Sequence, residues 1–426
     1  MPIIKPFRGI LYNKNKTGDI ASVAAPPYDV ISAKKQDELY RASSYNIVRL
    51  ILGRRFQQDS LQANRYTRSR DFLAEWLAKG VLIQDAEPAL YIYEQYYREN
   101  SAKKSRLGFI ALMRLEGFSK DGILPHENTF KAPKEDRFNL ICETKANLCP
   151  IFSLYQDSRR VIKKILLSEC KNLKPVIDVS SDGSRHRLWR LTDKKVIGKI
   201  QRAMAAKTAF LADGHHRYEV ALQFKAKMRK ASNGAAGPYD YVMMYFADMD
   251  PKALTILAAH RMIKGIGPFK VEDMIDKLKR HFIVRRLNSK SDLTGWLKAS
   301  RDASRQFGVY ADKEAFVIKL KNHASLAEIE PRVRSREWKA LDVSILHQLI
   351  LKKILNISDS EGSVAYTRDP KEAVQEVDNG NYKLAFLLKP TRISQVESIA
   401  RNKELMPHKS TYFYPKPLSG LVINKL

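Results

Sequence analysis

Five consecutive residues concentrate side chains that can bind anions, exchange protons or hold a metal ion: Asp213, Gly214, His215, His216 and Arg217. They follow the apolar run 208–211 and precede the helix-like pattern 220–224, so we expect them at a turn from a strand into a helix. Gly214 permits a tight backbone there, and Asp213 can cap the helix or hold a cation. Because the free N–H groups of a helix N-terminus attract anions, the segment predicts a phosphate or metal site.

The spacing of the two histidines favours phosphate chemistry over a metal site built on both of them. His215 and His216 are adjacent, whereas two histidines on one element usually grip a single metal at HxH or HxxxH spacing. We therefore interpret one histidine as a catalytic or phosphate-binding group and the other as its orienting neighbour, with Arg217 as a second anion ligand. The alternative is that these side chains only have structural partners in the core or on the surface.

A second candidate is the pair His126-Glu127, which follows Leu124-Pro125 in a predicted loop. A carboxylate beside an imidazole can act as a general base when burial raises its pKa toward neutrality. The alternative is a surface loop in which Glu127 caps the following turn. Nearby, Asp136-Arg137 is expected to form an ion pair at the start of a helix.

A third group of phosphate-type side chains lies near the C-terminus, in what we expect to be a proline-bounded strand: Lys409, Ser410, Thr411 and Lys416. Lysine binds phosphate as a point charge, and the two hydroxyls can hydrogen-bond to it. The alternative is an edge strand with solvated lysines. The aromatic run 412–414 must pack against the fold.

Composition limits the class of partner. The 426 residues suffice for two or three domains, and the 75 Lys and Arg against 46 Asp and Glu give a net charge of +29. That charge favours anionic partners, namely nucleic acid, a membrane surface or phosphorylated small molecules, unless it is only a solvated surface, since the basic residues are dispersed. No apolar run approaches the roughly 18 residues of a membrane span, and three cysteines are too few for a disulfide framework, so we expect a soluble cytoplasmic protein without a membrane partner.

The elements that must position these groups alternate between helices and strands, which predicts a mixed α/β fold. In the N-terminal part we expect a helix at 33–42 capped by Ser32, a strand at 47–52, a helix at about 60–80, and a hairpin of 89–98 with 105–116. Further expected elements are strands at 150–155, 186–192, 241–246, 316–320 and 383–389, and helices at 157–170, 194–206, 270–282, 342–354, 370–377 and 391–402. Three regions are expected: 1–118, 119–265 and 266–426.

Motifs along nearly the whole chain resemble domain-of-unknown-function family 1015 (DUF1015). In the order expected for that family they are Pro6–Gly9, Ala25–Val30, Tyr45–Leu50, Pro125–Thr129, Asp136-Arg137, Ala212–Glu219, His260-Arg261 and Met406–Phe413. The resemblance implies membership of this family.

The Asp-Gly-His-His-Arg segment is also similar to a motif of the ParB-like superfamily, in particular of its free-serine kinases. That resemblance implies a ParB-like central region with flanking α/β regions, and a kinase that converts free L-serine or a similar hydroxy compound to its phosphate ester. It implies catalytic roles for Glu127, His215 and Asp213, with Glu127 as general base, Asp213 as a ligand of Mg²⁺, and pyrophosphate, ATP or ADP as donor. The phosphate-binding or substrate-binding residues would be His126, Thr129, Arg137, Gly214, His216, Arg217, Lys409, Ser410 and Thr411.

Two other functions are compatible with the same residues. A phosphoserine-type phosphatase would use the same anion site with water as acceptor. A ParB-like nucleic-acid-binding protein would explain the net charge of +29, although the sequence has no helix-turn-helix signature with a basic recognition helix. Walker A, GxGxxG, HExxH and GxSxG motifs are absent, so a kinase would need a different phosphate site.

Overall fold

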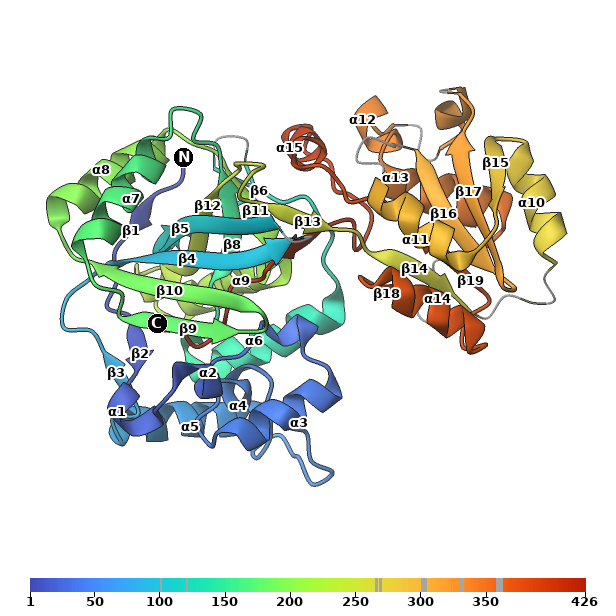
Figure 1. Cartoon of the computed structure of the whole chain (residues 1–426). Helices are drawn as coiled ribbons and strands as arrows, with labels where there is room; N and C mark the ends of the chain where they lie inside the picture. The colour runs from blue at the N-terminus through green and yellow to red at the C-terminus, as the bar shows by residue number, and fades with distance from the viewer. Residues whose placement is uncertain are drawn as a thin grey trace. The chain divides into compact units, whose positions relative to one another are not determined.

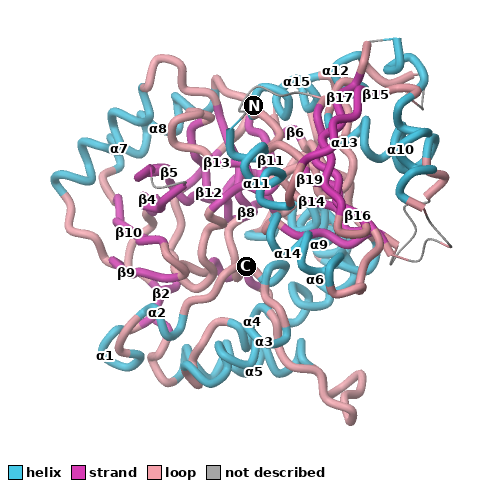
Figure 2. The backbone as a smooth tube through the Cα atoms, turned by 45° about the vertical axis from the view of Figure 1, so that its right-hand side comes forward, coloured by secondary structure: helices cyan, strands magenta, loops and turns pink. Residues whose placement is uncertain are grey.

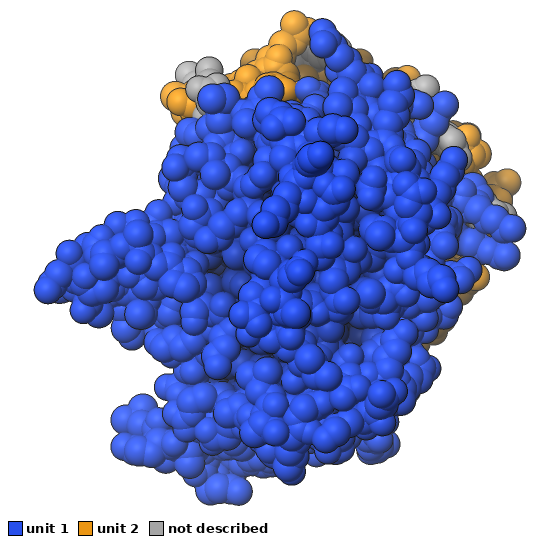
Figure 3. All heavy atoms as spheres, turned by 90° about the vertical axis from the view of Figure 1, so that its left-hand side faces the viewer, with its two compact units in different colours: residues 1–125, 129–255, 415–426 blue, residues 126–128, 256–414 orange. Residues whose placement is uncertain are grey.

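A computed structural model of the chain describes all residues except 100–101, 120–121, 265–266, 268–269, 300–304, 323, 330–332 and 358–362. Its elements confirm the mixed α/β class (Figure 1). The contacts divide the chain into two compact units, which Figure 3 colours separately. Unit 1 comprises Met1–Pro125, Thr129–Thr255 and Pro415–Leu426, and unit 2 comprises His126–Asn128 and Ile256–Tyr414. Among the described residues, no helix combines the length and the apolar character needed to cross a lipid bilayer.

Unit 1 is built on one mixed sheet. The strands run in the spatial order β6 (Ile123–Leu124), β11 (Ala209–Asp213), β8 (Ile151–Tyr155), β12 (Tyr241–Asp248), β5 (Ala102–Arg114), β4 (Leu90–Glu99), β10 (Ser184–Leu191) and β9 (Ile177–Ser181), with β1 (Ile4–Lys5) on β5. β11 is parallel to β6 and β8 is parallel to β12, whereas the other pairs are antiparallel. The central strands are almost wholly apolar and buried, which is typical of a sheet covered on both faces.

Two groups of helices cover this sheet. α7 (Val161–Asn172) and α8 (Lys194–Ala205) lie side by side in both views (Figures 1 and 2) and bury Ile162 and Ile200 in the core. The other group contains α5 (Arg65–Ala78), α6 (Lys131–Thr144) and α9 (His215–Ala231), in which α6 packs against both α5 and α9. The α6–α9 pair carries most of the candidate residues of unit 1, and the sheet fixes its position through the β11–α9 turn.

The N-terminal elements confirm two predictions and correct one. Helix α3 (Ala33–Ala42) starts as predicted, because the Ser32 hydroxyl accepts from the Lys35 N–H at 3.2 Å. The predicted helix at 60–80 is α5, whose start is set by the Asn64 cap. The predicted strand at 47–52 is wrong: Val48–Ile51 forms helix α4, since Asn46 accepts from the Val48 N–H at 2.9 Å and turns the chain. A short apolar run that is buried on all sides has no periodicity that separates strand from helix.

Small elements complete unit 1. They are β2 (Ile10–Tyr12), which pairs with β3 (Leu82–Gln84), β7 (Ala146–Asn147), which pairs with β21 (Asn424–Lys425), and the helices α1 (Lys14–Thr17), α2 (Ile20–Val23), η1 (Tyr28–Val30) and η2 (Pro238–Asp240). The C-terminal segment of the chain therefore runs through unit 1. Before β21, this segment forms two isolated antiparallel β-bridges, one between Ser419 and Ala25 and one between Ile423 and Ile10.

The predicted hairpin of 89–98 with 105–116 is confirmed as β4 and β5, with its connection at 100–101 outside the described residues. These strands lie between β10 and β12 of the same sheet, so the expected first region and most of the second contribute to one unit. The expected boundary between 265 and 266 falls outside the part of the chain that the structure describes.

Unit 2 is an antiparallel sheet with helices around it. Its strands run in the order β15 (Phe282–Leu287), β17 (Glu314–Leu320), β16 (Gln306–Ala311), β19 (Leu384–Leu387), β14 (His260–Ile263) and β18 (Val364–Thr367). The helices are α10 (Val271–Lys279), α11 (Lys290–Ala299), η3 (Ala324–Glu328), α12 (Arg336–Lys339), α13 (Asp342–Ser344), η4 (Ile345–Ile354), α14 (Pro370–Asp378) and α15 (Ile393–Arg401). The predicted helices at 270–282, 370–377 and 391–402 are thereby confirmed, and 345–354 is wound as a π-helix. The predicted C-terminal strand is shorter than expected: β20 is Tyr412–Tyr414, and 409–411 form a turn and its exit.

Candidate anion-binding site

The Asp-Gly-His-His-Arg segment lies at the predicted strand-to-helix turn. Gly214 separates β11 from α9 and is the N-cap residue of the helix, with a φ of 94°, in the left-handed region that favours glycine. A Cβ at this position would lie 2.9–3.0 Å from the guanidinium of Arg217. Glycine is therefore required both for the backbone conformation and for the close approach of that guanidinium.

Gly214 takes the N-cap position of α9, and Asp213, the residue before it, contacts two cationic side chains. Its Oδ2 accepts from Nη2 of Arg217 at 2.7 Å, and its Oδ1 accepts from Nζ of Lys416 at 2.5 Å. Both carboxylate oxygens are thus occupied by cationic side chains. A Mg²⁺ ion beside them would be repelled by two positive charges, so Asp213 does not fit the expected metal ligand. Among the described residues, no group of three or more His, Cys, Asp or Glu side chains could hold a metal ion.

The sequence analysis grouped Lys416 with Lys409, Ser410 and Thr411, whereas in the structure Lys416 contacts Asp213 and Asp29. Its side chain is only 8% exposed and bridges Asp213 and Asp29, with 2.5 Å from Nζ to Oδ2 of Asp29. Burial alone would lower the pKa of Lys416, but the carboxylates of Asp213 and Asp29 raise it well above its usual value. The Gln95 amide donates to the Lys416 carbonyl at 3.2 Å, which fixes the backbone behind the ammonium group.

The Arg217 side chain is nearly buried, and only some of its N–H groups donate hydrogen bonds to described residues. Nη1 donates to the Pro150 carbonyl at 2.6 Å and Nη2 donates to Asp213. A guanidinium has five N–H groups, so three N–H groups of Arg217 have no partner among the described residues. Burial alone would lower the pKa of Arg217, but the charge of Asp213 raises it, so the group stays cationic. A buried cation with unused donors is suited to binding the oxygens of an anion.

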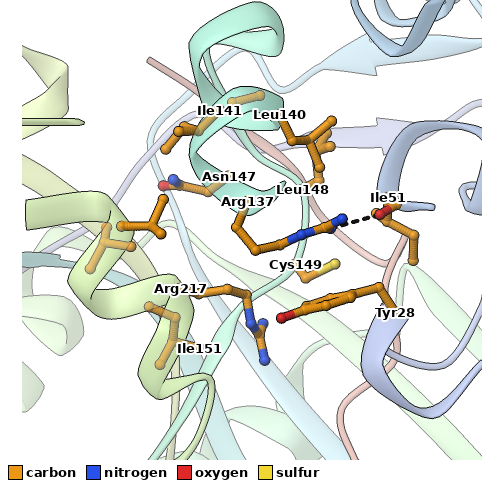
Figure 4. Close-up of a pocket in the computed structure, with 13 residues that line it drawn as sticks. Tyr28, Ile51, Arg137, Leu140, Ile141, Asn147, Leu148, Cys149, Ile151 and Arg217 are labelled. Carbon is orange, nitrogen blue, oxygen red and sulfur yellow. Dashed lines mark hydrogen bonds between the residues drawn. The ribbon is translucent and has the colours of Figure 1, made fainter. Parts of the chain in front are cut away.

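A cavity of about 60 Å³ opens beside Arg217. Figure 4 shows the side chains that surround it. The polar ones are Tyr28, Arg137, Asn147, Cys149 and Arg217, and the aliphatic ones are Ile51, Leu140, Ile141, Ala146, Leu148, Ile151, Val220 and Val242. All of them belong to unit 1.

Arg137 forms the predicted ion pair with Asp136, to whose Oδ2 its Nε donates at 2.7 Å. Its Nη1 donates to the Ile51 carbonyl at 2.7 Å, and its guanidinium carbon lies 3.9 Å from the centre of the Tyr28 ring. Burial would raise the pKa of Asp136, but Arg137, Tyr66 and Arg65 hold it below its usual value. Arg137 therefore shares Asp136 with Arg65, and it contacts the face of the Tyr28 ring by a cation–π interaction.

Tyr28 and Cys149 are the neutral polar groups of the cavity. In Figure 4 the Tyr28 hydroxyl points toward the guanidinium of Arg217. Burial raises the pKa of Tyr28 to about 12, so the phenol keeps its proton and can donate. Cys149 Sγ lies 2.8 Å from the Ser419 hydroxyl, and burial raises the pKa of this thiol too. Sequence reasoning missed Tyr28 and Cys149, and only the motif 25–30 of the family resemblance indicated Tyr28.

The first turn of α9 also anchors the segment before α6. His216 Nε2 accepts from the Phe130 N–H at 2.9 Å, and the two rings stack. Thr129 donates to Oε2 of Glu219 at 2.8 Å. His215, the first residue of α9, is buried, with 5% of its surface exposed. The structure therefore brings the predicted residues Thr129 and His216 together, in contacts that hold 129–130 against the helix.

A second group of predicted residues comes together within unit 2. Glu127 Oε1 accepts from the Lys409 N–H at 2.8 Å and lies 3.5 Å from Nδ1 of His408. His126 Nε2 lies 2.9 Å from the Thr411 hydroxyl. Glu127 therefore contacts a turn that lies 282 residues further along the chain.

Arg261 also binds the turn that contains Lys409. Its Nη2 donates to the Lys409 carbonyl at 3.1 Å. Arg261 is 1% exposed, and its Nε donates to Nε2 of His347 at 3.2 Å. Ser410 donates back to the Pro407 carbonyl. Lys409 itself has a φ of 55°, so these contacts hold a lysine in the left-handed region.

Comparison with known proteins adds a family and a loose structural likeness. A family model described as "Protein of unknown function (DUF1015)" matches residues 4–344. No curated protein matches the sequence.

Three solved structures illustrate the structural likeness. A mutant free serine kinase in complex with AMP has 12% identity, covering 70% of this chain and 87% of that one, with a TM-score of 0.36. A conserved hypothetical protein from Pyrococcus furiosus has 13% identity, covering 73% and 97%, with a TM-score of 0.34. A C-terminally truncated SbnI from Staphylococcus aureus has 12% identity, covering 73% and 85%, with a TM-score of 0.35. Such superpositions are too loose to equate individual residues.

Proposed function

We propose that this chain, which belongs to the DUF1015 family of proteins of unknown function, is a small-molecule phosphotransferase. The proposed reaction moves a phosphoryl group from pyrophosphate, ATP or ADP to the hydroxyl of a small hydroxy compound. Free L-serine is the first acceptor to test, because the segment 213–217 resembles the free-serine kinases. The proposed location is the cytoplasm.

The observation that carries this proposal is the state of Arg217. Its guanidinium is 14% exposed, stands at the start of α9 and has three N–H groups without a partner among the described residues. Phosphoryl transfer needs little covalent chemistry from the protein and much electrostatic stabilisation of phosphoryl oxygens. Arginine supplies that stabilisation at a low cost of reorganisation when it is already fixed, as Asp213 and the Pro150 carbonyl fix Arg217.

In the proposed mechanism, Glu127 accepts the proton of the acceptor hydroxyl, while Arg217, with His215 and His216, stabilises charge on the transferred group. Lys409, Ser410 and Thr411 would bind the donor phosphates, with His126, Thr129, Gly214 and Arg137 supporting the site. Because Asp213 does not fit a Mg²⁺ ligand, no step is assigned to that ion through Asp213. Positive charge for the reaction comes instead from the arginine and lysine side chains of the chain itself.

A donor-by-acceptor screen followed by phosphorus NMR tests the proposal. Pyrophosphate, ATP and ADP are each incubated with L-serine or a related hydroxy compound, and a new phosphomonoester signal supports a kinase. Release of orthophosphate alone, from a donor or from phosphoserine, would instead indicate a phosphatase. Absence of turnover in every combination, together with salt-dependent retardation of DNA or RNA, would replace the proposal by nucleic-acid binding.

Matched variants make the screen specific to the site. Arg217→Gln should lower turnover by roughly 10²–10³-fold, as loss of one preorganised donor to a developing charge does. Arg202→Gln removes an exposed arginine of α8 and should leave turnover within a few-fold of the original protein. Equal turnover in both variants would remove Arg217 from the mechanism.

A further inference from the structure

The cavity beside Arg217 is lined by both apolar and polar side chains. Eight of its thirteen lining residues are aliphatic or alanine, and they come from α4, α6, β7, β8, α9 and β12 and from the loop between β7 and β8. The polar lining residues include Tyr28 and Arg217, and the Tyr28 hydroxyl points toward the Arg217 guanidinium in Figure 4. Neither the Tyr28 hydroxyl nor a nitrogen of Arg217 is among the buried side-chain atoms without a hydrogen-bond partner, so the unpartnered donors of these two side chains are accessible to a ligand or to water in the cavity.

Two of the polar side chains that line the cavity have hydrogen-bond donors without a partner among the described residues. The Tyr28 hydroxyl has no hydrogen-bond partner among the described residues. Three N–H groups of Arg217 also have no hydrogen-bond partner among them. Asn147 offers no acceptor, since its Oδ1 already accepts from the Met243 N–H at 3.1 Å and from the Asn424 amide at 3.1 Å. Arg217 and Tyr28 therefore present donors that one acceptor group of a bound ligand could share.

We infer that the cavity binds a small carboxylic acid of about two to four carbon atoms. Its carboxylate would accept from Arg217 and the Tyr28 hydroxyl, and its aliphatic part would lie against Leu148, Ile151 and Val220. This inference deepens the proposed function and rests on it for one point only: the acceptor hydroxyl would belong to this same acid.

A carboxylate fits the local charge better than a phosphate dianion. Arg137 and Arg65 share Asp136, and Arg217 and Lys416 share Asp213 and Asp29, so these paired groups carry one net positive charge and not two. A second negative charge would have to be desolvated beside aliphatic side chains. The planar fork of a guanidinium also matches the two oxygens of a carboxylate.

Cys149 provides a readout that does not depend on phosphoryl transfer, because it is the one cysteine of three that lines the cavity among the described residues. In the full-length protein without any phosphoryl donor, its modification by methyl methanethiosulfonate is followed by peptide mass spectrometry. Acetate, propionate, L-lactate and L-serine are compared with inorganic phosphate as protecting probes. At least one carboxylate should slow modification of Cys149 several-fold, while the rates of Cys142 and Cys170 stay unchanged.

Two variants test the recognition. Tyr28→Phe keeps the ring on Arg137 and removes only the hydroxyl, and it should weaken protection roughly tenfold, as loss of a hydrogen bond to a charged group does. Tyr96→Phe, which lies on β4 away from the cavity lining, should not change protection. Arg217→Gln should abolish protection, and isothermal titration of the same acid should agree.

Several outcomes overturn the inference. They are protection by inorganic phosphate alone, absence of protection by any of the four carboxylates, and protection that survives Tyr28→Phe unchanged. Carboxylate protection in a protein that transfers no phosphoryl group would leave the cavity assignment standing and reject the proposed function alone. Phosphoryl transfer without carboxylate protection would do the reverse.

Discussion

The ammonium group of Lys416 lies 2.5 Å from Oδ1 of Asp213, although 203 residues separate the two in sequence. Asp213 in turn holds Arg217 through its other oxygen at 2.7 Å. The C-terminal segment therefore sets the charge and the orientation of the β11–α9 turn. Lys416 supports the Arg217 guanidinium through Asp213, and it is not one of the residues that line the cavity.

We predict that Lys416→Met destabilises the protein and displaces Arg217. The substitution leaves Asp213 and Asp29 facing each other without their shared cation, and loss of one partner of a buried pair costs about 3–5 kcal/mol. Because the Asp29 side chain is 31% exposed, we expect the lower end of that range. Urea unfolding measures the change, and Lys425→Met, at an exposed lysine of the same C-terminal segment, is the control. Equal midpoints for the two variants would contradict the bridging role of Lys416.

Two glycines should respond to alanine with opposite signs. Gly214→Ala places a Cβ at a φ of 94° and within 2.9 Å of Arg217, so we expect a loss of about 1–3 kcal/mol in the free energy of unfolding. Gly198 lies in helix α8, where a Cβ would meet only Arg202 at 3.5 Å. Gly198→Ala should therefore stabilise by roughly 0.5–1 kcal/mol. Thermal unfolding compares both variants with the original protein, and a stable Gly214→Ala variant would contradict the geometry of the turn.

The turn at 213–217 was predictable from sequence, whereas its charge partners were not. An apolar run, a glycine and a helical pattern in succession are a local signal, and the structure has strand, turn and helix in that order. Asp29 and Lys416 are 387 residues apart and meet only through the tertiary fold, so no spacing rule could join them. The same limit explains why the sequence did not predict Lys416 as a partner of Asp213.

The error at 47–52 has a different cause. Val48, Leu50 and Ile51 are all buried. A short run of apolar residues therefore shows no alternation between buried and exposed positions that would distinguish a helix from a strand. What decides the outcome is Asn46, whose amide donates to the Ser22 carbonyl at 2.7 Å while its oxygen caps the Val48 N–H. Asn46 combines a contact with a distant segment and a local contact with Val48. The distant contact exists only in the folded chain, so the sequence alone does not reveal this role of Asn46.

Stability should fall as pH drops from 6.5 toward 4, and His186 should account for part of that fall. Burial and the nearby guanidinium of Arg106 lower the pKa of His186 to about 4, and its Nδ1 lies 2.7 Å from the Tyr93 hydroxyl. The depressed pKa means that the folded state holds a neutral ring, so its contribution is present above pH 6.5 and is lost as pH falls through 4. The full contribution is about 3 kcal/mol.

His186→Gln should therefore reduce the slope of unfolding free energy against pH between 4 and 6.5. Urea titrations at several pH values measure the slope. His260, whose pKa burial and Arg261 also lower to about 4, contributes equally to both proteins and cancels in the difference. A slope unchanged by the substitution would show that His186 is protonated in the folded state.

Glu127→Gln should abolish turnover while the protein stays folded. The amide keeps the shape and can still accept from the Lys409 N–H, which lies 2.8 Å from Oε1, but it cannot take up a proton. Loss of a general base lowers the rate by roughly 10²–10⁴-fold. Glu135→Gln, at an exposed glutamate of α6, is the control. Turnover of Glu127→Gln within a few-fold of the original protein would remove this carboxylate from the mechanism.

Lys409→Ala should raise KM for the phosphoryl donor more than KM for the acceptor. The backbone of Lys409 is held at both ends, since its N–H donates to Glu127 at 2.8 Å and its carbonyl accepts from Arg261 at 3.1 Å. Its side chain is exposed, so alanine removes the ammonium group and leaves both backbone bonds in place. Lysine binds phosphate as a point charge, and the loss should therefore appear in donor binding and grow weaker at high ionic strength.

The matched control for this substitution is Lys403→Ala, an exposed lysine of unit 2 with a φ of 57° against 55° at Lys409. Both variants place alanine in the left-handed region, so any backbone strain is the same and cancels in the comparison. Steady-state kinetics with donor and acceptor varied in turn separates the two KM values. A donor KM that rises equally in both variants would assign the effect to strain, and a donor KM unchanged in Lys409→Ala would show that the 407–411 turn acts only through its backbone on Glu127.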